Sequence, residues 1–216
     1  YPMNALANDQ TERLRNILKD YPEITFGSYT GQTKQKLSTA INEYKNLNGG
    51  RDPLPNELIA REQMQTTPPH ILITNYSMLE YLLLRPKSSI FFSEEYAQKW
   101  EYIILDEAHV YSGSTGIEVS NLLRRLKARL QTNRLRYILT SATLGSDDDN
   151  QAVAEFAKDL CSAEFDVDDV IRAQRVKILA PQTVFELGAD FYVELAEMMS
   201  LKSEVEVGYF FISKFD

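Results

Sequence analysis

The sequence has little of what a disulfide framework, a zinc centre or a membrane span would need. Its 216 residues include one cysteine, Cys161, and two histidines, His70 and His109. A single cysteine excludes an internal disulfide, and so few soft ligands argue against zinc. The apolar runs Met78 to Leu84 and Tyr102 to Leu105 fall far short of the roughly 20 residues of a membrane helix, and no secretory signal opens the chain. We therefore expect a soluble, cytoplasmic protein.

Negative charge is concentrated in one stretch of the chain. The whole sequence has 31 acidic and 23 basic residues, a net charge of −8. Residues 145 to 170 hold nine of the acids and one lysine, so the rest of the chain is neutral, with 22 acids and 22 bases. An acidic pI therefore does not exclude a polyanionic partner. Six bases between Arg124 and Arg136 are one candidate patch, although a solvated helix face is the more ordinary interpretation.

Short apolar segments alternate with helical segments along most of the chain. The predicted strands are Ile24 to Tyr29, His70 to Ile73, Tyr102 to Leu105, Arg136 to Thr140 and a segment within Val170 to Ile178. The predicted helices are Asn8 to Tyr21, Thr33 to Leu47, Tyr76 to Leu84, Gly116 to Leu130 and Gln151 to Leu160. This alternation predicts βαβ units, and therefore an α/β fold with a parallel sheet and helices on both faces. The strands lack polar alternation, as expected when both of their faces are covered.

Two adjacent carboxylates follow the most apolar of these strands. Tyr102 to Leu105 leads directly into Asp106-Glu107-Ala108-His109. Ligands of open parallel sheets bind beyond the carboxyl ends of the strands, and an acid pair at that place suits a nucleotide with Mg²⁺. Asp106 is expected to hold the ion, largely through water, and Glu107 to orient the water that attacks the γ-phosphate. For the acid pair alone, a solvated loop after a strand is an equally good interpretation.

The next predicted strand along the chain ends in hydroxyl side chains, Ser141-Ala142-Thr143. If the two strands are neighbours in the sheet, Ser141 and Thr143 lie near Asp106 and His109. Hydroxyl groups there can hydrogen-bond both the acid and the imidazole, so that a change at the phosphate is felt elsewhere. The alternative is an ordinary cap between a strand and a helix, because serine and threonine favour such places.

Taken together, the acid segment and the hydroxyl segment resemble motifs II and III of superfamily 2 helicases, the DEAD/DEAH-box group. Other segments fit in order. Pro2 to Leu6 resembles motif Ia, Tyr29 to Gly31 lies where that group has its glycine-containing nucleic-acid loop, and Ile73 to Leu79 resembles motif Ib. The segments His109 to Gly113 and Leu122 to Leu126 are similar to a bacterial branch linked to DNA repair and phage defence. The resemblance covers roughly residues 1 to 176.

The resemblance implies an ATP-dependent motor with a RecA-like lobe and with ATP and Mg²⁺ as cofactors. It assigns Asp106 and Glu107 to the nucleotide, with Asp106 as the metal ligand. It gives His109, Ser141 and Thr143 catalytic or coupling roles between the nucleotide site and a second lobe. For His109, a histidine that merely packs against its neighbours is the alternative.

The resemblance also implies a nucleic-acid track, with DNA weakly favoured over RNA. Motifs Ia and Ib line this track in the family, which points to Asn4, Ala5, Gly31, Thr74 and Asn75. Backbone amides and small polar side chains suit phosphate contacts that ignore base sequence. For Thr74 and Asn75, a strand end followed by a helix cap is a plausible alternative.

A phosphate-binding loop of the pattern Gly-x-x-x-x-Gly-Lys-Ser/Thr does not occur in the 216 residues. In the family this loop lies shortly before motif Ia. We therefore expect residues 1–180 to be a partial RecA-like lobe without its phosphate-loop strand, and residues 181–216 to be an extension or the start of a connection. The expected partners, besides nucleic acid, are the N-terminal segment and the second RecA-like lobe of a longer protein.

Three hypotheses remain at this point. The first is a segment of an ATP-dependent helicase or translocase that is inactive alone, because a triphosphate without its loop loses its main backbone contacts. The second is a nucleic-acid-binding module derived from a helicase lobe that does not use ATP. The third is a phosphate-loop ATPase that does not move on nucleic acid, which the motif Ib-like segment and Ser141-Ala142-Thr143 disfavour.

Overall fold

The computed structural model describes residues 4–85, 90–142, 149–172, 190–193 and 196. The chain divides into two units, Tyr1–Arg172 and Ala173–Asp216, and all the strands and helices described below lie in the first. In the second unit, residues 190–193 and 196 are helical. Among the described residues, no helix combines the length and the apolar character that crossing a membrane requires.

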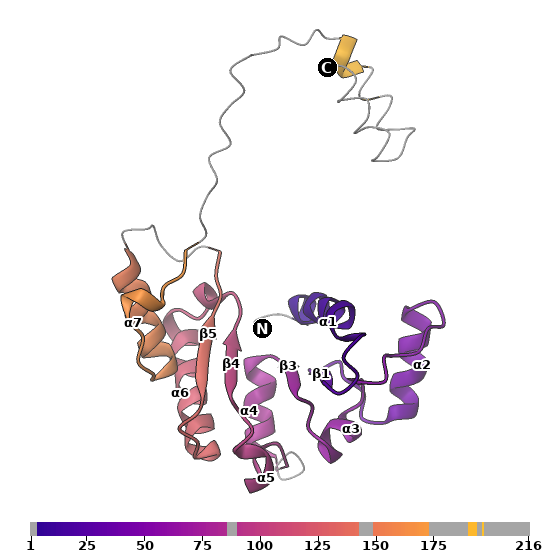
Figure 1. Cartoon of the computed structure of the whole chain (residues 1–216), viewed down its shortest axis with the longest axis horizontal. Helices are drawn as coiled ribbons and strands as arrows, with labels where there is room; N and C mark the ends of the chain where they lie inside the picture. Colours follow the sequence, from indigo (N-terminus) through magenta and orange to yellow (C-terminus); the bar gives the residue numbers. More distant parts are fainter. Residues whose placement is uncertain (1–3, 86–89, 143–148, 173–189, 194–195, 197–216) are drawn as a thin grey trace. The chain divides into compact units, whose positions relative to one another are not determined.

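Strands and helices alternate along the first unit, as the sequence predicts (Figure 1). The strands are β1 (Phe26–Tyr29), β2 (Glu57–Leu58), β3 (Ile71–Thr74), β4 (Tyr102–Leu105) and β5 (Arg136–Leu139). The α-helices are α1 (Asn4–Leu18), α2 (Leu37–Leu47), α3 (Arg61–Thr66), α4 (Tyr76–Leu84), α5 (Glu94–Ala97), α6 (Gly113–Leu130) and α7 (Asn150–Cys161). Short 3₁₀ helices, η2 (Ala108–Val110) and η4 (Val167–Asp169), complete the described elements.

All strand pairs are parallel. β2, β1 and β3 form one sheet in that order, and β4 and β5 form a second. β1 pairs with β3 so that Tyr29 lies opposite Thr74, and β4 pairs with β5 so that Leu105 lies opposite Leu139. Because paired parallel strands end at the same edge, the segments after β1 and β3 meet, and so do the segments after β4 and β5. The predicted α/β fold with parallel strands is confirmed.

A shared hydrophobic core joins the two sheets. The helix α6 places Val119, Leu123 and Leu126 on one buried face, at the spacing of three and four residues expected of an amphipathic helix. These side chains belong to the same core as Ile103 of β4 and Tyr29 of β1. Each fully buried leucine contributes about 1.5–3 kcal/mol relative to its exposed state, so this packing fixes β4 against α6 more firmly than the short strand could alone.

One face of the β4–β5 sheet is open among the described residues. Along β4, Ile103 and Leu105 are buried, whereas Tyr102 is 50% and Ile104 is 55% exposed. Ile138 of β5 is 44% exposed. Successive side chains of a strand point to opposite faces, so these three exposed residues share the face away from α6. The sequence leads us to expect cover on both faces, and in the described part of the chain this sheet is covered on one.

Some elements differ from the predicted ones in their bounds. The helix predicted from Thr33 begins instead at Leu37, because the Thr33 hydroxyl donates to the carbonyl of Ser28 and accepts from the amide of Thr30, which closes a loop. From the four prolines of Arg51 to Pro69 we expect an excursion around one short helix; the structure has that helix, α3, and also the strand β2, which pairs with β1. The strand predicted within Val170 to Ile178 falls mostly outside the described residues.

Asn56 connects the end of α1 to the start of β1. Its side chain is buried, and its Nδ2 group lies 3.0 Å from each of three carbonyl oxygens, those of Leu18, Tyr21 and Ile24. The backbone carbonyl of Asn56 accepts a hydrogen bond from the backbone amide of Phe26 at 3.0 Å. One amide side chain thereby pairs the orphan carbonyls at a helix end with the loop that enters a strand, and it fixes the direction in which β1 leaves that loop.

We predict that Asn56→Ala lowers the free energy of unfolding by about 1–3 kcal/mol, because it leaves buried carbonyl groups without a donor. Urea unfolding followed by circular dichroism measures the change. Asn48→Ala is the matched control, since the Asn48 side chain donates to a single, partly buried carbonyl, that of Tyr44. Equal losses of unfolding free energy in the two variants would show that the contact of Asn56 with three carbonyl groups stabilises the fold no more than an ordinary side-chain hydrogen bond.

Tyr111 is a buried core residue that follows η2. Its ring makes an edge-to-face contact with the ring of Tyr76, with centroids 6.4 Å apart. Burial raises the pKa of Tyr111 to about 12, and the nearby carboxylate of Asp106 and the Tyr76 ring add to the rise. A phenol with a pKa raised in this way stays protonated in the folded state where an unfolded tyrosine, with its pKa near 10, has lost its proton.

This raised pKa predicts a loss of stability at high pH. Below about pH 10 the tyrosine is protonated in both states, and as the pH rises toward about 12 only the unfolded state ionises, so unfolding becomes easier across that window. The Tyr111→Phe variant should lose less stability between pH 9 and pH 11 than the unmodified chain in urea unfolding. Tyr21→Phe, at an exposed position, should behave as the unmodified chain does. If Tyr111→Phe followed the unmodified chain over this range, the assignment would be wrong.

Candidate functional site

The carboxyl ends of β4 and β5 are tied together beyond the strands themselves. The amide of Thr140 donates to the carbonyl of Leu105, and the amide of Ala108 donates to the carbonyl of Thr140, both at 2.9 Å. The loop formed by Asp106 and Glu107 therefore lies between two backbone hydrogen bonds to one residue of the neighbouring strand. Its position relative to that strand is set by backbone geometry rather than by the acid side chains.

Asp106 is bonded by the side chain of Thr140. The Thr140 hydroxyl Oγ1 donates to Asp106 Oδ1 at 2.5 Å. From the sequence we expected Ser141 and Thr143 near Asp106 and His109, and we placed Thr140 inside the strand. Because β5 ends at Leu139, opposite Leu105, the residues that directly follow the two paired strands are Asp106 and Thr140.

His109 lies between a carboxylate and a hydroxyl. Its Nδ1 atom is 3.0 Å from the Ser141 hydroxyl and 3.2 Å from Glu107 Oε2. The imidazole is about one-third exposed, as is the Glu107 side chain. The structure places Ser141 against His109, as expected from the sequence, and it also places Glu107 there. The Thr140 hydroxyl bonds the acid Asp106, and the Ser141 hydroxyl contacts the imidazole. Thr143 lies outside the described residues.

Glu107 has an unusual backbone. Its φ is 50° and its ψ is 48°, which is the left-handed region. A residue with a Cβ atom adopts this conformation at a cost of about 1–3 kcal/mol, and such residues cluster where a side chain must be aimed. At Glu107 the left-handed turn ends the extended chain of β4 and begins η2, so that the side chains of Glu107 and His109 face one another within two residues.

The acid pair suits a cation that brings most of its own ligands. Among the described residues, no group of three or more aspartate, glutamate, histidine or cysteine side chains is placed to hold a metal. Mg²⁺ usually takes one or two carboxylates and fills its remaining positions with water and phosphate oxygens. Asp106, half-buried at a loop and already oriented by a hydroxyl, fits that kind of ion, and a site built wholly from protein ligands does not fit.

The predicted nucleic-acid residues lie at the carboxyl edge of the other sheet. The Thr74 hydroxyl donates to the carbonyl of Tyr29 at 2.8 Å, and Asn75 Oδ1 accepts from the amide of Met78 at 2.8 Å, which caps α4. Both side chains therefore have the strand-end and helix-cap roles that the sequence analysis left open. Gly31 follows β1 at the same edge, so these three residues are brought together by the pairing of β1 with β3.

The loop that holds Gly31 is braced from α3. Arg61 Nη2 donates to the carbonyls of Thr30, at 2.8 Å, and Gly31, at 3.4 Å. The guanidinium also lies over the Tyr29 ring, 5.3 Å from its centroid. A Cβ atom at Gly31 would meet no heavy atom within 4 Å, so the glycine there is not required by crowding. Asn4 and Ala5 are the first residues of α1, and their side chains lie outside what the structure describes.

An aromatic contact connects the two edges. Tyr76 follows Asn75 at the start of α4, and Tyr111 follows His109 by two residues, so the edge-to-face contact of these rings places the segment after β3 beside the segment after β4. The acid pair and the predicted nucleic-acid residues Gly31, Thr74 and Asn75 therefore lie in one region of the first unit. This contact could not be predicted from the sequence, because no spacing rule relates residues 35 positions apart.

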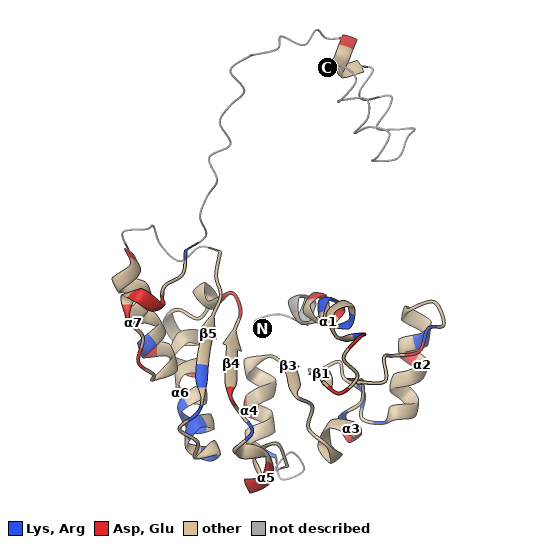
Figure 2. Ribbon diagram, viewed as in Figure 1, with Lys and Arg blue, Asp and Glu red and all other residues tan. Residues whose placement is uncertain are grey.

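The bases of α6 lie away from this region. Figure 2 shows the acid pair at one end of β4 and the basic residues of α6 toward the opposite end. Arg125 forms an ion pair with Glu80 at 2.7 Å, and Arg124 and Lys127 donate to Ser162. These contacts favour the solvated-face interpretation of the basic residues over a nucleic-acid patch.

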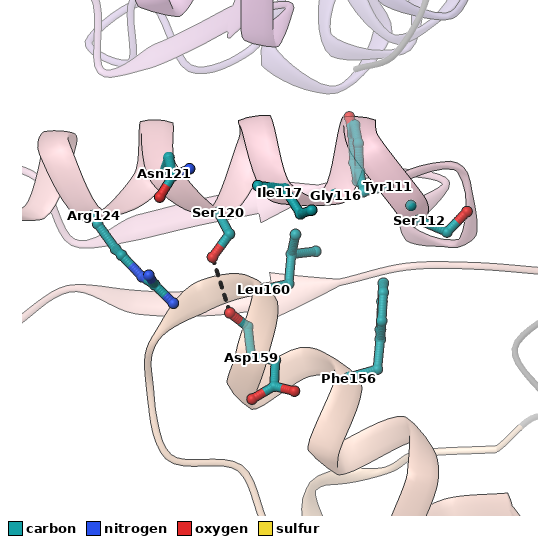
Figure 3. A pocket seen from close by; sticks show the side chains of 11 residues that line it. Tyr111, Ser112, Gly116, Ile117, Ser120, Asn121, Arg124, Phe156, Asp159 and Leu160 are labelled. Atoms are coloured by element: carbon teal, nitrogen blue, oxygen red, sulfur yellow. Dashed lines mark hydrogen bonds between the residues drawn. The ribbon is translucent and has the colours of Figure 1, made fainter.

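Two hollows of the described surface have linings that do not include the acid pair. One, of about 520 Å³, lies between α6 and α7 and is lined by Tyr111, Ile117, Phe156 and others (Figure 3). In it the Ser120 hydroxyl donates to the carbonyl of Asp159 at 3.0 Å, a bond that joins the two helices. A second hollow, of about 570 Å³, lies between α1, α2 and the loop after β1, and its lining holds more acidic than basic side chains, which disfavours a phosphate chain there.

The sequence of this chain is similar to those of known helicases. A model of the DEAD/DEAH box helicase family matches residues 1–151. The chain is 38% identical over 178 residues to the Druantia protein DruE of Escherichia coli (strain UMEA 4076-1), in a match that covers 73% of this chain and 9% of DruE. It is 31% identical over 152 residues to the uncharacterized ATP-dependent helicase YprA of Bacillus subtilis (strain 168), in a match that covers 68% of this chain and 16% of YprA.

The fold is similar to that of a solved helicase. The crystal structure of the DUF1998 helicase MrfA bound to DNA superposes with a TM-score of 0.54 and 26% identity, over 76% of this chain and 19% of that one. The chain thus spans less than a fifth of the length of each of these proteins, and its parallel α/β fold is that of a RecA-like helicase lobe. Because the family match includes both strands that carry the acid pair and the hydroxyls, the chain belongs to the DEAD/DEAH box helicase family.

Proposed function

We propose that this chain is the segment of an ATP-dependent DNA helicase or translocase that supplies the acid pair for ATP hydrolysis and part of the nucleic-acid track. The observation that carries the proposal is the joining of β4 and β5 at their carboxyl ends, where Thr140 holds Asp106 and Ser141 lies against His109. Family membership supports the reaction, and the similarity to MrfA, a helicase whose structure was solved with DNA bound, supports DNA as the partner.

The acid pair divides its work between the metal and the water. Asp106 offers a carboxylate oxygen to Mg²⁺, and the bound ion would neutralise charge on the phosphates. Glu107 lies one residue further along, where the left-handed turn directs its carboxylate away from β4 and toward His109. There it can accept a hydrogen bond from the attacking water and take up its proton.

His109 and its neighbours transmit the state of this site. The imidazole contacts both Glu107 and Ser141, so a movement of the water-orienting acid alters a contact of the strand end after β5. Two residues after His109, the ring of Tyr111 contacts the ring of Tyr76, which follows Asn75. A nucleotide that binds the closed form of two lobes more tightly than the open form would bias both contacts, which is the condition for coupling ATP to nucleic acid.

The nucleic-acid track uses backbone more than side chains. The side chains of Thr74 and Asn75 already have partners in β1 and α4. Their contribution to the track is therefore the fixed presentation of the strand end and of the amides at the start of α4, which suits a phosphate. Contacts of this kind position a strand without reading its bases, as a motor that moves along DNA requires.

A longer protein that contains this segment should lose DNA-stimulated ATP hydrolysis when Glu107 is changed to glutamine. We expect a fall of at least about 100-fold in turnover, which is typical for the loss of a general base, with nucleotide binding retained because the metal acid is intact. Phosphate release measures turnover, and a fluorescent ATP analogue measures binding. Glu118→Gln, at an exposed position on α6, removes the same charge elsewhere and should leave both unchanged. Normal turnover in Glu107→Gln would overturn the assignment.

The chain of 216 residues by itself should hydrolyse no measurable ATP. The Gly-x-x-x-x-Gly-Lys-Ser/Thr pattern is absent from it, so the triphosphate lacks the backbone cradle and lysine that such loops provide. A phosphate-release assay with Mg²⁺ and DNA tests this. Turnover that requires Mg²⁺ and disappears in the Glu107→Gln variant of the same chain would show that the segment is a complete ATPase.

The same missing pattern favours a second candidate, a nucleic-acid-binding module that does not use ATP. The two differ in one measurable respect. An ATP-driven motor has different affinities for DNA with and without a non-hydrolysable ATP analogue, whereas a module of this second kind has the same affinity in both conditions. Fluorescence anisotropy with a labelled single strand and a longer protein containing this segment distinguishes them.

A further inference from the structure

Thr140 has a hydrogen bond that neither packing nor strand formation requires. Its side chain is exposed, so the residue does not serve the core. Its amide and its carbonyl are both engaged by the loop that holds Asp106, so its backbone has almost no freedom relative to the acid. On that fixed backbone, the β-branched side chain has a stiff χ1, and its hydroxyl reaches Asp106 Oδ1.

The hydroxyl of the neighbouring residue, Ser141, contacts a different group. In extended chain, successive side chains point to opposite faces, and Ser141 lies against His109 rather than Asp106. Thr140 and Ser141 therefore contact two different groups of the site, Asp106 and His109. A hydroxyl that donates to a carboxylate forms a charge-assisted hydrogen bond, which is among the stronger kinds and directional.

We propose that Thr140 is a positioning residue for Asp106, which fixes the carboxylate through Oδ1 so that its other oxygen is presented to the divalent cation. This inference rests on the proposed function, since it assigns a role at the same site. Partners that orient the ligands of a metal without touching the metal typically change its affinity by about 10- to 100-fold. A carboxylate without this hydroxyl rotates more freely about its last bond, and it must be ordered each time a cation binds.

The test uses a longer protein that contains this segment and four variants. Thr140→Val keeps the shape and β-branching of the side chain and removes the hydroxyl, Thr140→Ala removes it without any risk of overpacking, and Thr140→Ser retains it. Thr66→Val is the matched control, because Thr66 is also exposed and its hydroxyl also has a local partner, the carbonyl of Glu62 in α3. Thermal melting of each variant establishes that it is folded.

Two readouts separate positioning from a general structural role. The first is binding of Mn²⁺ in the presence of a non-hydrolysable ATP analogue, measured by electron paramagnetic resonance. Thr140→Val and Thr140→Ala should weaken Mn²⁺ binding by about 10-fold or more, while Thr140→Ser and Thr66→Val stay within about twofold of the unmodified protein. The second is the Mg²⁺ concentration for half-maximal ATP turnover, which should rise in the same two variants, with turnover largely restored at saturating Mg²⁺.

The outcomes distinguish this inference from the proposed function. If the unmodified protein shows no Mg²⁺-dependent ATP turnover, the proposed function fails. If it does, and Thr140→Val and Thr140→Ala bind Mn²⁺ as tightly as the unmodified protein, the role of Thr140 fails alone. A loss in Thr140→Ser equal to that in Thr140→Val would also overturn the inference, because the retained hydroxyl would then have no effect.

Discussion

The parallel pairing of β4 with β5 is the constraint on which the candidate site depends. A pair of four-residue strands would have only marginal stability alone. The buried face of α6 packs against β4 and stabilises the pair. Once Leu105 lies opposite Leu139, the next residues of each chain must meet, and they are an acid and a threonine. The backbone bonds between Thr140 and the loop after β4 extend this pairing by one further residue on each side. Side-chain chemistry at the site follows from that extension.

A strained backbone completes the arrangement. A strand that continued straight past Asp106 would carry Glu107 and His109 away from the end of β5. The left-handed conformation of Glu107 turns the chain at once into η2, and it brings the imidazole back toward Ser141. The cost of this conformation is met by the surrounding hydrogen bonds and by the burial of Ala108 and Tyr111 directly after the turn. A glycine would adopt the turn more easily, but it would not provide a carboxylate.

The two sheets contribute to one region, although in the described part of the chain no strand of one pairs with a strand of the other. Their connection is made by side chains, through the common core and through the contact of Tyr76 with Tyr111. Side-chain contacts of this kind yield more readily than a continuous ladder of backbone hydrogen bonds. That difference is compatible with the coupling of two ligand sites that we propose for this segment. In the described part of the chain, one face of β4 and β5 exposes apolar side chains, those of Tyr102, Ile104 and Ile138.

The sequence by itself determined the fold class, the helices with a clear apolar face and the segments that carry the acid pair and the hydroxyls. These are local properties, since the period of the apolar residues and the residue types at strand ends can be read within a few positions. Only the tertiary structure decided that the Thr140 hydroxyl bonds Asp106, that the Thr74 hydroxyl bonds the end of β1, and that Tyr76 meets Tyr111. Each of these depends on which strands pair, in which register and on which face, and residues far apart in the chain settle that together through a shared core.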